Sequence, residues 1–92
     1  MITAIVMIDV EVDKIPDVAS KIASAPQVTD VYSVTGNVDL IAIVKTPQYD
    51  DLATIVPESI AKIPGVKSLT THLAFKEYSS QELASAFDLG LD

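Results

Sequence analysis

The sequence contains no cysteine and few basic residues, and these two shortages exclude several kinds of function. Without cysteine, the 92-residue chain has no disulfide bond, no thiolate nucleophile and no thiolate ligand for zinc. Six basic side chains stand against 13 acidic ones, which gives a net charge of −7. Such a charge repels polyanions, so we expect no direct contact with nucleic acid or with an anionic membrane surface.

Long hydrophobic runs are missing as well. The most apolar stretches, residues 2–8 and 38–44, are far shorter than the roughly 20 residues of a membrane-spanning helix. The N-terminus has no basic segment ahead of a hydrophobic run, so we predict no signal peptide and expect the cytoplasm as location. Apolar residues nevertheless make up 49% of the chain, more than a monomer of this size can bury. This surplus predicts a homo-oligomer.

The chain matches itself when it is shifted so that Ala4 falls on Ala42. An acidic residue, a helix-spaced trio and a Pro-x-Val terminus then coincide in the same order: Asp13, Val18, Ile22, Ala23, Pro26 and Val28 fall on Asp51, Val56, Ile60, Ala61, Pro64 and Val66. Such a match describes one supersecondary unit that is used twice. Two copies are too few for an open solenoid, so they must close on each other, within one domain or across a subunit boundary.

In the first copy, alternating apolar residues predict a strand over residues 2–10. Its even-numbered residues form one apolar face. Asp13 is the predicted N-cap of a helix that Pro26 ends, and residues 28–35 alternate as a second strand. Gly36-Asn37 predicts a two-residue hairpin turn, because both residue types tolerate positive φ.

In the second copy, a third strand is predicted over residues 38–45 and a helix from Thr46-Pro47 to Pro64-Gly65. Pro57 should kink or interrupt this helix. Its predicted buried stripe consists of Tyr49, Leu52, Ala53, Val56, Ile60 and Ile63. A fourth strand follows over residues 66–76, with Leu69, Thr71, Leu73 and Phe75 towards the helices and Ser68, Thr70, His72 and Ala74 on the other face.

The predicted order is βαββαβ, which is the ferredoxin-like plan of a four-stranded antiparallel sheet with two helices on one face. This α+β domain is assigned to residues 1–78. Ser79-x-x-Glu82 is a capping box that opens a short helix, so residues 79–92 are assigned to a C-terminal helix and tail of the same domain. Ile5 and Met7 make the uncovered sheet face partly apolar, which predicts dimers that pack sheet to sheet.

Three motifs stand in an order that resembles a known family: Gly36-Asn37-Val38-Asp39 in the hairpin, Pro64-Gly65-Val66 before the fourth strand, and Thr70-Thr71-His72 along it. The chain resembles the effector-binding RAM domain of the Lrp/AsnC feast/famine transcription regulators over nearly its whole length. Because Met1 directly precedes the first strand, we expect no helix-turn-helix domain and a likeness to the stand-alone RAM proteins.

The resemblance implies dimers that assemble into rings, commonly octamers, with a small effector, usually an amino acid, between neighbouring dimers. It implies that the N–H groups of Gly36 and Asn37 hold the effector carboxylate and that Asp39 accepts from its ammonium group. This agrees with the chemistry of glycine, turn amides and a fixed carboxylate. Thr70, Thr71 and His72 would form the second wall. Val38 stands where many members carry an aromatic residue, which implies a wider or differently selective pocket.

Other readings of the chain receive less support from the residues. His72 is the only histidine and has no cysteine or glutamate beside it, while Asp9, Glu11 and Asp13 are better explained as solvated carboxylates, so no metal or other cofactor is expected. No catalytic spacing is present, and we expect no enzyme. Two alternatives stay open: a small dimeric α/β-barrel oxygenase, and an assembly partner of full-length Lrp/AsnC regulators without its own ligand.

Overall fold

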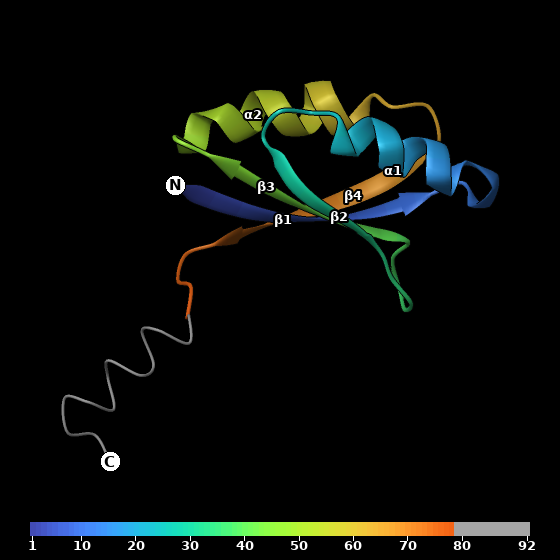
Figure 1. Cartoon of the computed structure of the whole chain (residues 1–92), viewed down its shortest axis with the longest axis horizontal. Coiled ribbons are helices and arrows are strands. Elements are labelled where there is room, and N and C mark those ends of the chain that lie inside the picture. The colour runs from blue at the N-terminus through green and yellow to red at the C-terminus, as the bar shows by residue number, and fades with distance from the viewer. Residues whose placement is uncertain (79–92) are drawn as a thin grey trace, which may run out of the picture.

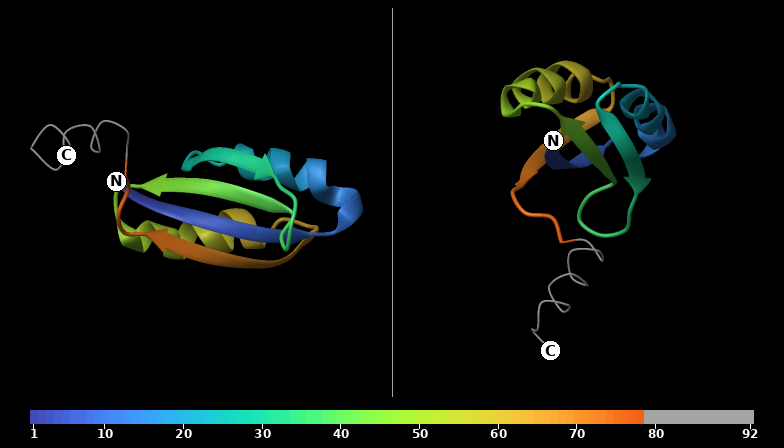
Figure 2. Two further views of the ribbon diagram at one scale, coloured as in Figure 1. Left: turned by 90° about the horizontal axis from the view of Figure 1, so that it is seen from below. Right: turned by 60° about the vertical axis from the view of Figure 1, so that its left-hand side comes forward.

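A computed structural model describes residues 1–78, which fold into one antiparallel sheet covered by helices on one face (Figure 1). The four strands are β1 (Ile2–Val10), β2 (Val28–Ser33), β3 (Leu40–Thr46) and β4 (Val66–Ala74), in the order β2-β3-β1-β4. Helices α1 (Ile15–Ala23) and α2 (Leu52–Ile55) cover the same face (Figure 2). The predicted ferredoxin-like βαββαβ fold is confirmed.

Alternation along the two central strands creates the core between the sheet and the helices. Every second residue of β1 and β3 is buried, and these side chains meet buried residues of the helices. The largest side chains without any exposure are Ile8, Ile22, Leu40, Ile60, Val6, Val18 and Val44. Burial of each such side chain stabilises the fold by about 1.5–3 kcal/mol relative to its exposure. The predicted inner face of residues 2–10 is therefore correct.

The first helix begins differently from the prediction. Asp13 lies inside a 3₁₀ turn, Val12–Lys14, and makes no capping hydrogen bond to α1. The N-cap position belongs to Lys14, and Pro16 in the first turn has no N–H to donate to a capping side chain. The predicted Asp13 cap is wrong for this reason.

The second helix consists of three short pieces. A 3₁₀ turn (Tyr49–Asp51) leads into α2, which continues as a π-helical segment (Val56–Ala61) around Pro57. Proline removes one backbone donor, so the predicted interruption is confirmed. The predicted burial of Tyr49 and Ala53 is wrong: both are exposed, Tyr49 by 61%, because they overhang the sheet edge beside β4.

The β2–β3 connection is longer than the predicted two-residue turn. β2 ends at Ser33 and β3 begins at Leu40, and Gly36 alone among the loop residues has a positive φ, 117°. The N–H of Val34 donates to the carbonyl of Asp39 over 3.1 Å, while the Asp39 N–H donates to Ile8 O of β1. Asp39 is thus bonded both to Val34, next to the end of β2, and to β1, and residues 35–38 form the turn. β4 likewise ends at Ala74 rather than at residue 76.

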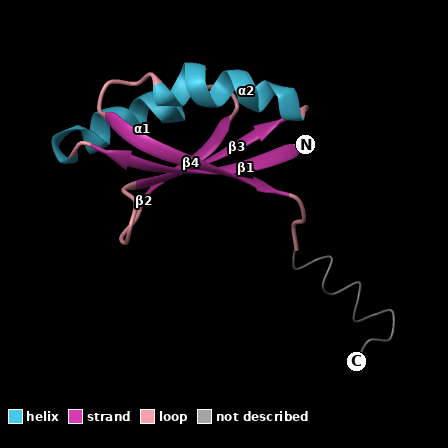
Figure 3. Cartoon of the chain, turned by 180° about the vertical axis from the view of Figure 1, so that it is seen from behind, coloured by secondary structure: helices cyan, strands magenta, loops and turns pink. Residues whose placement is uncertain are grey.

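The second face of the sheet carries no helix of the described residues (Figure 3). Half-buried apolar side chains occupy its centre, namely Ile5 and Met7 on β1 and Ile41 and Ile43 on β3. The predicted C-terminal helix, beginning at the Ser79 capping box, lies outside the described residues. No helix within residues 1–78 is long and apolar enough to span a membrane.

Candidate ligand-binding site

The loop between β2 and β3 projects from the sheet on the side opposite the helices (Figures 1 and 3). Gly36 lies in this loop, and a Cβ atom built on it would meet no heavy atom within 4 Å. Gly36 and Asn37 are exposed, while Val38 and Asp39 are half-buried. The predicted Gly36–Asp39 segment is thus a loop with open space beside its glycine.

Asp39 is held in place by three hydrogen bonds. Its carboxylate Oδ2 accepts from the backbone N–H of Val10 at 2.9 Å, its own N–H donates to Ile8 O, and its carbonyl accepts from Val34 N–H. The side chain therefore fastens the loop to the end of β1. A carboxylate has two oxygens and about four acceptor positions, so Asp39 keeps capacity for a second donor. Sequence reasoning did not predict this structural bond.

The backbone N–H groups between Thr35 and Val38 donate no hydrogen bond to any residue of the described chain. Exposed N–H groups of a turn are suited to an anion, because they offer oriented partial positive charge. A fixed carboxylate lies at the end of the same loop. The loop thus contains donors for an anion and an acceptor for a cation.

The three predicted residues of β4 do not share one face. Thr70 pairs with Met7 and His72 with Ile5, so both lie on the uncovered face, whereas Thr71 pairs with Val6 of the core-facing set. Successive strand residues point to opposite faces. Thr70 and His72 are therefore brought together, and Thr71 is not part of their surface. The predicted faces of these three residues are confirmed, and their part in a ligand-binding wall stays a prediction.

Within one chain, the hairpin loop adjoins β3, which is not a neighbour of β4 in the sheet. Strands β1 and β3 are neighbours, and β4 lies beyond β1, so the Thr70 backbone is two strand spacings from β3. Two spacings amount to about 10 Å.

The described residues contain no group of three side chains suited to a metal ion. Three acidic residues lie near the end of β1. Asp9 accepts a hydrogen bond from Ser68 Oγ at 2.9 Å, while Glu11 and Asp13 are exposed. The Asp9 bond links β1 to β4 and has a structural explanation. The acidic cluster accordingly offers no candidate metal centre.

An apolar groove lies elsewhere, between the start of the second helix and β4, and sequence reasoning did not predict it. Its volume is about 270 Å³, and it is lined by Tyr49, Leu52, Ala53, Val56, Thr71 and Leu73. Thr71 and Leu73 belong to the strand face predicted to meet the helices. The helix covers Leu73 incompletely and leaves it 44% exposed.

Comparisons with known sequences and with solved structures point to one protein family. The sequence model of the Lrp/AsnC ligand binding domain matches residues 3–83. The HTH-type transcriptional regulator FL11 of Pyrococcus horikoshii is 29% identical over 75 residues, which cover 82% of this chain and 49% of FL11. The chain thus spans about half the length of the curated relatives it matches.

Solved structures agree with this match. TTHA0845 from Thermus thermophilus superposes with a TM-score of 0.82 at 39% identity, covering 86% of this chain and 99% of that one. A transcriptional regulator from Neisseria meningitidis, solved as a complex with L-Met, shares the fold with a TM-score of 0.77 at 18% identity. The match covers 85% of this chain and 52% of that one.

Proposed function

Since this chain belongs to the Lrp/AsnC ligand-binding domain family, we propose that it binds a small effector, an amino acid, between dimers of a ring-shaped homo-oligomer. The family is the regulatory ligand-binding domain of transcription factors, which is non-catalytic. The proposal extends this to a regulatory role for the present chain in transcription or amino acid metabolism, and to the absence of enzymatic activity.

One observation carries the choice of ligand class: the same loop contains turn N–H groups that bond to no described residue and the fixed carboxylate of Asp39. A free amino acid carries a carboxylate and an ammonium group on one carbon. The N–H groups of Gly36 and Asn37 suit the carboxylate, and Asp39 suits the ammonium group. The L-Met complex of the Neisseria meningitidis regulator, which resembles this chain in fold alone, supports an amino acid as ligand.

Thr70 and His72 are proposed to contribute the second wall from a neighbouring subunit. Both are exposed on the uncovered sheet face, so their hydroxyl and imidazole groups are available to a ligand. Thr71 is left out of this wall because it faces the helices. Val38, half-buried beside the loop, would leave more room than an aromatic side chain and so admit a different effector.

The oligomer is part of the proposal because the apolar centre of the uncovered face needs a cover. Ile5, Met7, Ile41 and Ile43 form a continuous patch across the two central strands. A second copy of the sheet would bury this patch on both subunits at once. The net charge of −7 argues against nucleic acid or an anionic membrane as the direct partner.

A thermal-shift screen with each standard amino acid at millimolar concentration tests the function. A ligand at a hundred times its Kd stabilises the folded state by about 2.7 kcal/mol, so binding raises Tm clearly. The pair Asp39→Asn and Asp17→Asn then tests the site by calorimetry. Asp39→Asn should weaken binding by about 1–3 kcal/mol, because the ammonium group loses its charged partner.

Asp17 is the matched control, an exposed carboxylate on α1, in the helix layer on the side of the sheet opposite to the one from which the loop projects (Figure 1). Its variant should bind like the unchanged protein. No thermal shift with any amino acid would contradict the ligand class. Equal affinity of the Asp39 variant would show that Asp39 is structural only.

A further inference from the structure

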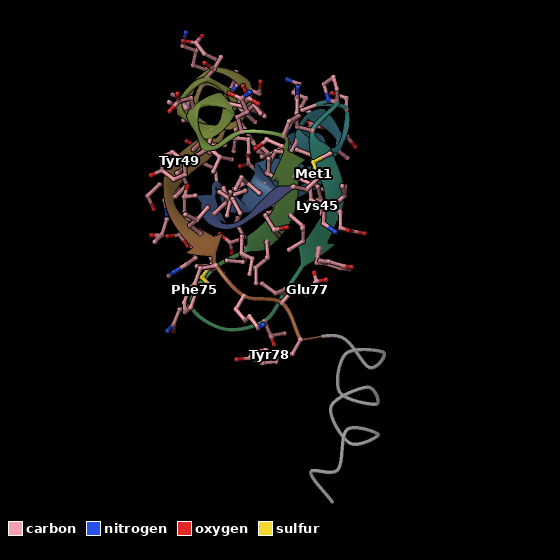
Figure 4. The ribbon with its side chains drawn as sticks, turned by 90° about the vertical axis from the view of Figure 1, so that its left-hand side faces the viewer. Met1, Lys45, Tyr49, Phe75, Glu77 and Tyr78 are labelled. Atoms are coloured by element: carbon pink, nitrogen blue, oxygen red, sulfur yellow. The ribbon has the colours of Figure 1, made fainter. Side chains whose placement is uncertain are left out.

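The edge of the sheet at β4 exposes large apolar side chains in one strip. Tyr49 is 61% exposed, Leu73 44% and Phe75 96%, and the groove of about 270 Å³ lies between Tyr49 and Leu73. Figure 4 shows Tyr49 and Phe75 along the same side of the molecule, beside β4. Within residues 1–78, nothing pairs with the outer edge of this nine-residue strand.

Proteins usually cover or blunt such an edge. The opposite edge strand, β2, is shorter, has an irregular register near Thr29 and carries Asp30. These features discourage pairing with another chain. β4 has such features only at its start, an irregular register between Val66 and Ser68 and the charged Lys67, while residues 68–74 pair with β1 without interruption. A groove next to an open edge is a place where an additional segment can pack.

We propose that the groove is filled by the C-terminal segment, residues 79–92, of a neighbouring subunit. Leu83, Ala86 and Phe87 follow one another at helical spacing and would form one apolar face. Glu82, Asp88 and Asp92 would stay in water. The groove lining is mostly apolar and contains no charged side chain, so it matches this face better than a charged ligand.

The direction of the chain after β4 indicates a neighbouring subunit as the donor of the segment. Residues 75–78 leave the sheet on the side opposite the helices, whereas the groove lies between β4 and the helix layer (Figures 1 and 3). The departing chain therefore heads towards the space that a sheet-packed partner would occupy. This inference rests on the oligomer of the proposed function but not on the identity of the effector.

The sequence allows a clean cross-linking test because the chain contains no cysteine. One chain carries Ala53→Cys, at an exposed position of the groove, and another carries Ala86→Cys in the segment. The two full-length chains are co-expressed and oxidised, so a disulfide between the two positions must join different subunits. Ala23→Cys, exposed on α1, replaces Ala53→Cys in the control pair.

We expect the groove pair to form the mixed disulfide in roughly tenfold excess over the control pair, because docking raises the effective concentration of the two thiols. Mass spectrometry identifies the joined peptides. No excess over the control overturns the inference. A third chain carries both substitutions, and a disulfide confined within it would also overturn the inference, since the segment would then dock on its own subunit.

Light scattering of the unmodified protein separates this inference from the proposed function. An assembly that forms without the groove disulfide defeats only the docking of the segment. A monomer defeats the proposed site between dimers and the docking together. Replacing Leu73 by aspartate in the Ala53→Cys chain should abolish the excess of the mixed disulfide, because the groove then receives an uncompensated charge.

Discussion

Replacement of Asp39 by alanine should destabilise the fold even in the absence of ligand. The Asp39 carboxylate accepts from the N–H of Val10 at 2.9 Å, and Val10 is only 3% exposed, so water has little access to replace the lost acceptor. A buried donor left without a partner costs about 1–3 kcal/mol. For a domain of this size, each kcal/mol moves Tm by roughly 4–8 °C. We therefore expect Asp39→Ala to lower Tm by at least about 4 °C.

Asp39→Asn is the matched variant, because its amide oxygen can still accept from Val10 while the charge is lost. Its stability should stay within about 1 kcal/mol of the unchanged protein. The two variants thus separate the two roles of Asp39: alanine removes the structural bond and the charge, and asparagine removes the charge alone. A ligand-binding loss in both variants, with a stability loss in alanine only, is the expected pattern.

Thermal unfolding at one fixed protein concentration measures the stability, since an oligomer's Tm depends on concentration. Hydrogen exchange of the Val10 amide reports the bond directly, because its protection should fall in Asp39→Ala and persist in Asp39→Asn. Unchanged protection and unchanged Tm in the alanine variant would refute the reasoning. In that case the loop is held by its backbone bonds to β1 without the carboxylate.

Four further substitutions test the fold and the site. Gly65→Ala should destabilise more than Gly36→Ala in urea unfolding. Both glycines have a positive φ, which strains alanine by about 1–3 kcal/mol. A Cβ atom on Gly65 would also lie 2.9 Å from the Lys14 side chain. Equal losses of stability in the two variants would contradict this prediction. Met7→Asp, in the centre of the uncovered face, should reduce the assembly to smaller species in light scattering while the circular dichroism of the fold persists. Val38→Phe should change which amino acids bind in the thermal-shift screen, and an unchanged profile would remove Val38 from the site.

Alternation in the central strands was predictable because burial there leaves a pattern of period two. The bounds and the inner face of β1 follow from this pattern, because every second side chain there must avoid water. The prediction for the fourth strand is wrong at its end: Phe75 lies beyond β4 and is 96% exposed instead of facing the helices. The interruption at Pro57 was equally predictable, because the missing N–H of proline disturbs only the helix turn in which it lies. These predictions depend on neighbours in the sequence or on one buried face.

The bond from Asp39 to Val10 was not predictable in the same way. It joins residues 29 positions apart and depends on how β1 extends past the start of β3. The sequence shows a turn glycine and a carboxylate but not the partner of either. The exposure of Tyr49 likewise depends on the outer limit of the sheet, which no periodic pattern records. Both features require the assembled fold.

The internal repeat explains why the loop and the C-terminal edge are the two places with proposed functions. The sequence shift aligns β1 with the start of β3 and β2 with the start of β4. In the sheet order β2-β3-β1-β4, β1 and β3 are the central pair, and β2 and β4 are the two edges. Under the same shift, Gly36 falls on Ala74 and Asp39 on Glu77. Gly36 can turn the chain at positive φ, which alanine disfavours, so the first copy folds back into β3 while the second continues to the end of β4.

The same difference separates Asp39 from Glu77. Asp39 is fastened to Val10, whereas Glu77 lies beyond β4 and is exposed (Figure 4). The first copy therefore ends in a fixed loop with a free acceptor position, which suits a small charged ligand. The second ends in an open edge with uncovered apolar side chains, which suits a segment of another subunit. If both proposals hold, a ligand at the loop and the segment at the groove would each depend on the neighbouring subunit, and removal of either should weaken the same assembly.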